Sequence, residues 1–101
     1  MAVMVILRVP GSPDDLERYA AGPGGEVMQR ISAAAKAAGA IRHTFAGGEG
    51  EVVVIDEWPD EESFQNFFAS QGEIPDVMRN AGAQGPPVTT VYRKLNTFDQ
   101  F

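Results

Sequence analysis

The chain has 101 residues, of which 44% are hydrophobic and 22% are charged, a composition typical of a globular domain rather than of a disordered or fibrous segment. Its net charge of −6, with 8 basic against 14 acidic residues, argues against nucleic acid as a partner. The absence of cysteine excludes disulfides and thiolate metal sites. We therefore interpret residues 1–101 as one small domain, for which a second copy would provide additional core.

The first predicted element is a strand. The sequence AVMVILRVP, residues 2–10, is apolar, rich in β-branched residues and followed by a glycine. No basic region precedes it as in a signal peptide, and no run in the chain approaches the roughly 18 apolar residues of a membrane span. We therefore expect a cytoplasmic protein that does not bind a membrane.

A helix is predicted next, with Ser12 at its N-cap and Pro13 in its first turn. The sequence AGPGG, residues 21–25, predicts a break before the helix continues to a stop at Gly39. Residues 40–58, AIRHTFAGGEGEVVVIDEW, then have the alternation and the glycine-rich turn of a β-hairpin.

The second half of the chain is predicted to contain a second helix and a last strand. Pro59 ends the hairpin, and residues 59–70, PDEESFQNFFAS, predict a helix whose acidic start complements the helix dipole. One or two irregular helical turns follow, and then a last strand, VTTVYRKL, at residues 88–95. The order β-α-β-β-α-β predicts an α+β, ferredoxin-like split βαβ fold, in which helices cover one face of a four-stranded antiparallel sheet.

The strand at residues 52–58 is apolar on both of its faces. Alternation places Val54, Asp56 and Trp58 on one face and Val53, Ile55 and Glu57 on the other. Because helices are expected on one face only, the second face needs other cover. This pattern predicts a homodimer.

Three segments together resemble the dimeric α/β barrel superfamily, and within it the antibiotic-biosynthesis monooxygenase type of domain. They are VMVILRV, VVVIDEWPDEESFQNFF and VTTVYRKL, which begin at residues 3, 52 and 88. The resemblance implies a homodimer in which two sheets enclose a barrel. It also implies a range of functions: cofactor-free oxygenation of aromatic polyphenols, haem degradation, isomerisation or cyclisation of small metabolites, and non-enzymatic stress-response or effector-binding roles.

Two residues at the end of the hairpin are the first candidates for a site. In the oxygenases of this superfamily a tryptophan at the place of Trp58 lines the substrate cavity, whereas a lone buried tryptophan is also common in a core. Asp56, on the same face, is either a base with a raised pKa or a carboxylate satisfied by Arg8 or another basic side chain. The sequence does not decide between the two roles of Trp58 or between the two roles of Asp56.

His43 is the only histidine, and it lies on a predicted sheet face. It is a candidate general base for taking a phenolic proton, or else a surface or satisfied core residue. Arg8 is expected on the pocket face, where it pairs with Asp56 or holds an anionic or phenolate oxygen. Tyr92 is expected to be half-buried with its hydroxyl hydrogen-bonded.

Haem and metal chemistry find little support in the sequence. Similar haem-degrading enzymes combine an asparagine on the first strand, a tryptophan on the third and a histidine on the second helix, and only Trp58 has a counterpart here. One histidine and scattered carboxylates give no metal-ligand spacing. We expect neither a cofactor nor a metal.

We therefore expect a cavity lined by five residues and suited to a flat aromatic or hydrophobic ligand: Trp58, Asp56, Arg8, Val54 and Ile6. The leading hypothesis is an enzyme resembling cofactor-independent monooxygenases, with Asp56 and His43 as catalytic candidates and Tyr92 as a further binding residue. The alternative is a non-catalytic ligand-binding or stress-response dimer.

The tail NTFDQF, residues 96–101, carries two apolar residues beyond the last strand. We expect Phe98 and Phe101 to dock on the partner subunit or on the barrel rim, against the alternative of a frayed terminus.

Overall fold

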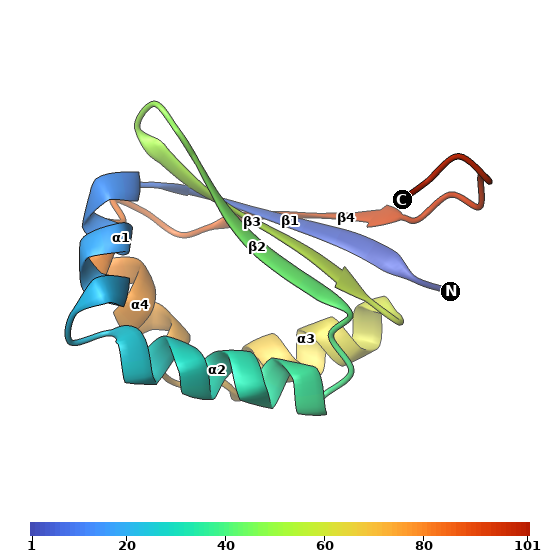
Figure 1. The fold of residues 1–101 in the computed structure, drawn as a ribbon, viewed down its shortest axis with the longest axis horizontal. Coiled ribbons are helices and arrows are strands. Elements are labelled where there is room, and N and C mark those ends of the chain that lie inside the picture. Colours follow the sequence, from blue (N-terminus) through green and yellow to red (C-terminus); the bar gives the residue numbers. More distant parts are fainter.

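The computed structural model describes residues 1–101, and its four strands form one sheet in the order β2-β3-β1-β4. Every neighbouring pair is antiparallel. The elements are β1 (Val3–Pro10), α1 (Pro13–Ala21), α2 (Gly25–Ala37), β2 (Arg42–Gly48), β3 (Glu51–Trp58), α3 (Glu61–Ser70), α4 (Ile74–Asn80) and β4 (Val88–Arg93). All four helices lie on one side of the sheet (Figure 1). The predicted α+β, ferredoxin-like fold is confirmed.

Side-chain caps fix where two of the helices begin. The Ser12 hydroxyl accepts a hydrogen bond from the Asp15 N–H at 3.1 Å, at the start of α1. The Asp60 carboxylate accepts one from the Ser63 N–H at 2.7 Å, at the start of α3. That bond stabilises the charged form and lowers the pKa of Asp60. Ser12 is the N-cap that the sequence predicts, and Asp60 belongs to the acidic helix start that the sequence predicts at residues 59–70.

The break between α1 and α2 depends on a glycine. Gly24 is buried against the ring of Tyr19, and a Cβ atom at this position would overlap the ring. The chain can therefore turn closely around the end of α1 only without a side chain here. The break predicted for residues 21–25 is observed, and α2 runs on to Ala37.

Strand register divides the sheet side chains between two faces. The inner face, which the helices cover, carries Val5, Leu7 and Val9 from β1 with Val52 and Val54 from β3. Its core consists of two clusters. One contains Val5, Leu7, Trp58 and Phe64, and the other Leu16, Val52, Val77 and Ala81.

The outer face has no helix over it (Figure 1). In the middle of this face, register aligns Ile6 with Ile55 on one side and with Thr90 on the other. These residues are all partly exposed, and Val88 and Tyr92 of β4 are 62% and 53% exposed. An apolar sheet face is thus left uncovered in a single chain.

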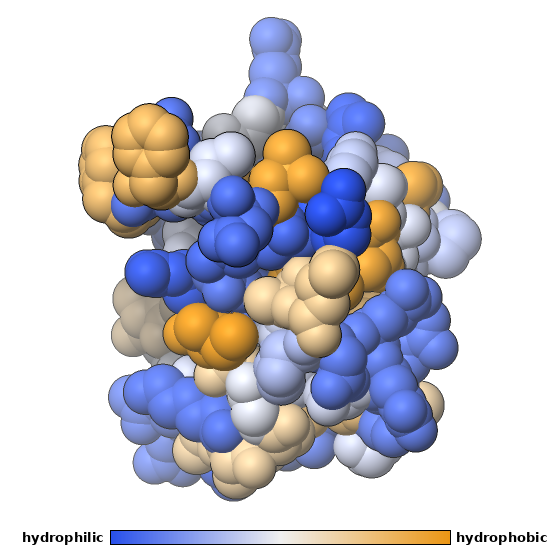
Figure 2. Space-filling view, turned by 90° about the vertical axis from the view of Figure 1, so that its right-hand side faces the viewer, coloured by the Kyte–Doolittle hydropathy of each residue, from blue (hydrophilic) through white to orange (hydrophobic).

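Both termini lie at one end of the molecule, and the tail after β4 extends away from the sheet (Figure 1). Phe98 and Phe101 are fully exposed. Viewed toward this end, Figure 2 shows apolar side chains projecting at one edge of a largely hydrophilic surface. The predicted docking of the tail on a partner stays a prediction. None of the helices has the length and apolar character needed to cross a membrane.

Candidate active site

His43 and Asp56 meet because they are opposite each other in the β2–β3 ladder. Directly opposed residues of an antiparallel pair share a face, with their Cβ atoms about 5 Å apart. The His43 Nδ1 lies 2.7 Å from Asp56 Oδ1. Because a carboxylate only accepts hydrogen bonds, Nδ1 carries the proton and donates it. This leaves Nε2, which makes no hydrogen bond to the protein, as the nitrogen able to take up a proton.

Trp58 holds the other oxygen of the same carboxylate. It is two residues beyond Asp56 on β3, and its indole Nε1–H donates to Asp56 Oδ2 at 3.2 Å. Trp58 is fully buried, with its ring packed against Phe64 and Phe67. Asp56 is only 8% exposed. Both carboxylate oxygens are therefore satisfied, and the carboxylate has little freedom to turn away from His43.

A cavity of about 100 Å³ lies next to this pair, between the inner face and the four helices. It is lined by members of both core clusters, such as Leu7 and Val77, so it lies between the two clusters. Of its 19 lining residues 16 are hydrophobic. The other three are Ser32, His43 and Asp56, so the only ionisable groups facing this apolar space are the paired ones.

Part of the gap exists because the second half of α2 offers small side chains to it. Ser32 and Ala35 line the cavity, and no residue of α2 is buried. On its outer side α2 is tied to α4 by an ion pair at 2.9 Å between Arg30 Nη2 and Glu73 Oε2. The hydrogen bond to Glu73 raises the pKa of Arg30. The helix thus covers the cavity without filling it.

The structure brings together some of the predicted site residues. His43, Asp56 and Val54 line the cavity, and Phe45, beside His43 on β2, lines it too. His43 contacts Phe45 edge to face, with ring centroids 4.9 Å apart, and 39% of the His43 side chain is exposed. His43 therefore lies at an edge of the cavity that solvent can reach.

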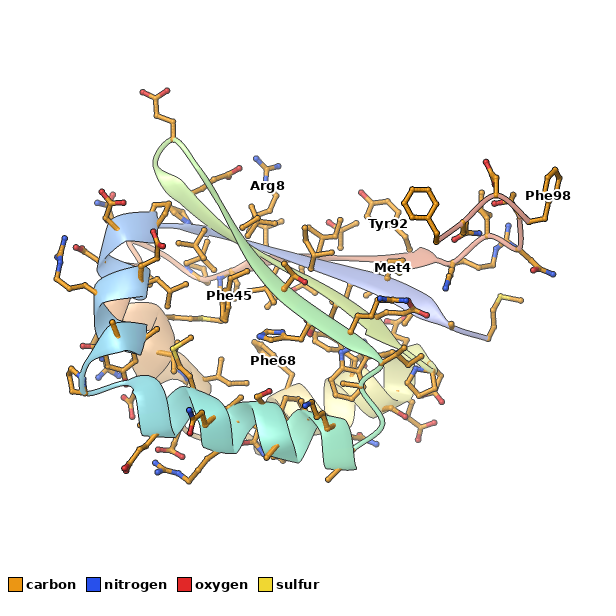
Figure 3. All side chains as sticks on the ribbon, in the orientation of Figure 1. Met4, Arg8, Phe45, Phe68, Tyr92 and Phe98 are labelled. Atoms are coloured by element: carbon orange, nitrogen blue, oxygen red, sulfur yellow. The ribbon has the colours of Figure 1, made fainter.

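Three other predicted residues lie on the outer face, so the expected common lining by Trp58, Asp56, Arg8, Val54 and Ile6 is wrong. In the register Arg8 is aligned with Val53 and Ile6 with Ile55, and these are outer-face positions. Figure 3 shows Phe45 and Phe68 on the helix side of the sheet and Arg8 and Tyr92 projecting from the other side. The misplacement comes from strand offset, which sequence alternation within each strand does not define.

The structure also corrects the contacts that were predicted for individual side chains. Arg8 does not pair with Asp56; its guanidinium lies 3.1 Å from a carboxylate oxygen of Glu51. The basic partner of Asp56 is His43. Tyr92, expected to be half-buried with a bonded hydroxyl, is exposed and makes no side-chain hydrogen bond in the structure. Trp58 packs in the core beside the cavity and is not among its lining residues.

Sequence reasoning missed the helix residues that complete the cavity. Ser32 of α2, Phe68 of α3 and Met78 of α4 all line it. The small residues of α2, of which Ser32 and Ala35 line the cavity, are the signal in the sequence that could have pointed to unfilled space under that helix. No group of three or more histidine, aspartate and glutamate side chains is placed to hold a metal ion.

Several solved structures share this fold. The cofactor-independent oxygenase SnoaB from Streptomyces nogalater is 21% identical, with a TM-score of 0.63 over 98% of each chain. A monooxygenase from the gene ActVA-Orf6 of Streptomyces coelicolor, in complex with Nanaomycin D, is 15% identical, with a TM-score of 0.66 over 99% of this chain and 93% of that one. A dimeric ferredoxin-like protein from an uncultured marine organism is 17% identical, also with a TM-score of 0.66 over 99% and 93%.

No protein-family model matches the chain, and no protein of curated function matches it. The similarity is therefore one of fold, and it extends over almost the whole of each chain. The fold is that of the antibiotic-biosynthesis-monooxygenase-like proteins, so the predicted resemblance is confirmed at this level.

Proposed function

We propose that the protein is a monooxygenase that acts on aromatic phenols without a cofactor, and that its active site is the cavity beside His43. The observation that carries this proposal is the 2.7 Å bond from His43 Nδ1 to a buried carboxylate, at the edge of an apolar cavity. The monooxygenases among its structural neighbours support the reaction class.

His43 acts as the general base in this proposal. Asp56 fixes the tautomer with the proton on Nδ1, so that Nε2 accepts the phenolic proton of the substrate. As His43 becomes positively charged, the Asp56 carboxylate at 2.7 Å stabilises that charge. Asp56 and Trp58 are positioning residues, because they act on the substrate only through His43.

The chemistry after proton removal belongs to the substrate. The phenolate delocalises negative charge onto a ring carbon, and that carbon gives its electrons to O₂ and forms a carbon–oxygen bond. The resulting hydroperoxide loses water and leaves a carbonyl, so that one oxygen atom enters the product and the other leaves as water. The protein's tasks are to position the ring, to exclude water and to exchange protons.

The apolar lining suits these tasks. With Ser32 as the only polar side chain beside the paired His43 and Asp56, the cavity offers an aromatic ring few competing hydrogen bonds. A ring that enters the cavity therefore gains from apolar burial, and its hydroxyl finds its partner at His43.

We also propose that a second copy covers the outer face. The partly exposed residues Met4, Ile6 and Ile55 lie there without helix cover, and a structural neighbour is a dimeric ferredoxin-like protein. In this arrangement the sheets meet at their outer faces, and each chain keeps its own cavity on the inner face. Arg8, Ile6 and Tyr92 would then contribute to the subunit interface.

The proposal is tested by oxygen consumption with a panel of hydroquinones and anthrones, for the wild type and His43→Gln. Removing the base should lower kcat/KM by about 100-fold or more. Thr44→Val is the matched control, because Thr44 is the next residue on β2, is exposed and points to the other face. It should stay within about twofold of wild type.

If the wild type consumes no oxygen with any of these compounds, the monooxygenase proposal fails and a non-catalytic ligand-binding dimer takes its place. If turnover occurs but His43→Gln retains it, the fold supports the reaction and His43 is not its base.

A further inference from the structure

Two of the four methionines of the chain line the cavity. Met28 comes from α2 and Met78 from α4, and both are partly exposed. Of the other two, Met1 is at the exposed N-terminus, and Met4 lies on the outer face, where it is aligned with Glu57. Met4 is partly exposed like the cavity methionines but does not line the cavity. It therefore serves as an internal reference for them.

The two cavity methionines line the space from different parts of the core. Met28 packs against the cluster that contains Leu16, and Met78 packs against the cluster that contains Trp58. The chain has no cysteine, so these two thioethers are the only sulfur atoms among the lining residues. A thioether is soft and polarizable, and oxidants convert it to a sulfoxide. The hydrocarbon side chains that make up most of the lining have no such lone pair to oxidise.

The proposed reaction forms an oxidant in this space. Its hydroperoxide intermediate loses water to leave a carbonyl, but a thioether offers it a second fate. The sulfur lone pair attacks the outer oxygen of the hydroperoxide, the O–O bond breaks and an S–O bond forms. Sulfur is oxidised by two electrons, the hydroperoxide is reduced to an alcohol, and the proton of the outer oxygen moves to the alcohol oxygen. No further reductant or oxidant is required.

The small size of the cavity favours this second fate. Its volume is only about 100 Å³, so a hydroperoxide formed there is enclosed by the lining side chains. The rotatable bonds of a methionine side chain let its sulfur atom approach an oxygen in such a space. Because two reactants held together react as if at a high concentration, oxidation inside the cavity should outpace oxidation by peroxide in the solvent.

We propose that Met28 and Met78 are modification sites, which the hydroperoxide of the protein's own reaction oxidises to methionine sulfoxide, and that this oxidation limits the number of turnovers. The inference rests on the proposed function for the source of the hydroperoxide. A sulfoxide is polar, so in an apolar lining it weakens the binding of an aromatic ring. Activity should therefore decline with the number of turnovers completed rather than with the time of incubation.

The first test measures the sulfoxide at each methionine by peptide mass spectrometry after aerobic turnover of anthrone or hydroquinone, whichever is oxidised faster. Catalase is present to remove H₂O₂ from the solvent, and a second sample receives H₂O₂ in place of substrate and catalase. Cleavage after lysine and arginine places Met4, Met28 and Met78 in separate peptides. The ratio of cavity sulfoxide to Met4 sulfoxide should be about tenfold or more higher after turnover than after H₂O₂.

The second test uses the double variant Met28→Leu, Met78→Leu, since leucine has a similar volume and no sulfur. Whatever its initial rate, this variant should complete more turnovers than the wild type before half of its oxygen uptake is lost. Met4→Leu is the matched control and should lose activity after as many turnovers as the wild type.

The outcomes separate this inference from the proposed function. Oxygen uptake with equal sulfoxide ratios in the two samples, or with equal inactivation of the double variant and the wild type, would overturn the inference and leave the proposed function intact. No oxygen uptake by the wild type with either compound would overturn both.

Discussion

Two neighbouring acids of β3, Asp56 and Glu57, are both buried, yet they face opposite sides of the sheet and have different partners. Glu57, on the outer face, is held by Lys94 Nζ at 3.1 Å and by Arg42 Nε at 3.4 Å. Asp56, on the inner face, is held by Trp58 and His43. Their exposed fractions are similar, at 5% and 8%.

The difference lies in what the partners can do. Lysine and arginine stay protonated near neutral pH, so Glu57 is neutralised by permanent charges and is structural. Tryptophan is neutral and histidine is the side chain that exchanges protons near neutral pH, so the Asp56 cluster can accept a proton without coming apart. Glu57 therefore stabilises the sheet, and Asp56 orients His43 as a base.

The largest effect is expected from a change to Asp56, the acid on the inner face. In Asp56→Asn the amide oxygen can still accept from Trp58, but its NH₂ group donates to His43 Nδ1 and forces the proton onto Nε2. The base is then blocked, and kcat/KM for an accepted phenol should fall by about 100-fold with the fold retained.

Glu57→Gln is the matched change on the outer face. It should leave kcat/KM within about twofold, because Glu57 does not line the cavity. It should lower the free energy of unfolding by about 1–2 kcal/mol, measured in urea. Equal losses of activity in the two variants would show that the two faces do not differ in this way.

Trp58→Phe tests the contribution of the hydrogen bond from Trp58 to Asp56 on the inner face. The ring packing against Phe64 and Phe67 is largely kept, and the hydrogen bond to Asp56 Oδ2 is lost. We expect kcat to fall by about tenfold as the carboxylate gains freedom, with about 1–3 kcal/mol lost from stability. Stopped-flow or steady-state oxygen uptake and urea unfolding measure the two effects. A loss of stability with kcat unchanged would make Trp58 a core residue only.

Deletion of residues 97–101 tests whether the C-terminal tail contributes to the proposed dimer interface. If Phe98 and Phe101 dock on a partner, their removal takes apolar area from the interface, and the dimer dissociation constant should rise by about tenfold. Sedimentation equilibrium measures it. An unchanged dissociation constant would indicate that the tail does not take part in the dimer.

The smallest effect concerns Asp60, an exposed acid whose role is confined to the start of α3. Its pKa is lower in the folded state because the carboxylate accepts the Ser63 N–H. Its stabilising contribution is therefore complete above the pKa of the unfolded chain and is lost as pH falls through the folded value. Asp60→Ala should be less stable than the wild type at pH 7, and the difference should shrink near pH 3 in urea unfolding. A difference that is independent of pH would contradict this cause.

The fold followed from the sequence more closely than the site did. The cap at Ser12, the acidic start of α3, the glycine break after α1 and the glycine turn of the hairpin are local signals, and all were found in place. The site depends on relations between strands. Alternation within a strand groups Arg8 with Ile6, but only the ladder shows that this group faces away from Asp56. The same ladder pairs His43 with Asp56, which no spacing in the chain predicts.

The most direct test of the central claim uses the fact that His43 is the only histidine. In a ¹⁵N NMR spectrum of the neutral imidazole, Nδ1 should be protonated and Nε2 unprotonated. Asp56→Asn should reverse this pattern, and a bound phenol should shift the Nε2 resonance of the wild type. A neutral ring with its proton on Nε2 in the wild type, and no response to phenol, would contradict the assignment of His43 as a base prepared by Asp56.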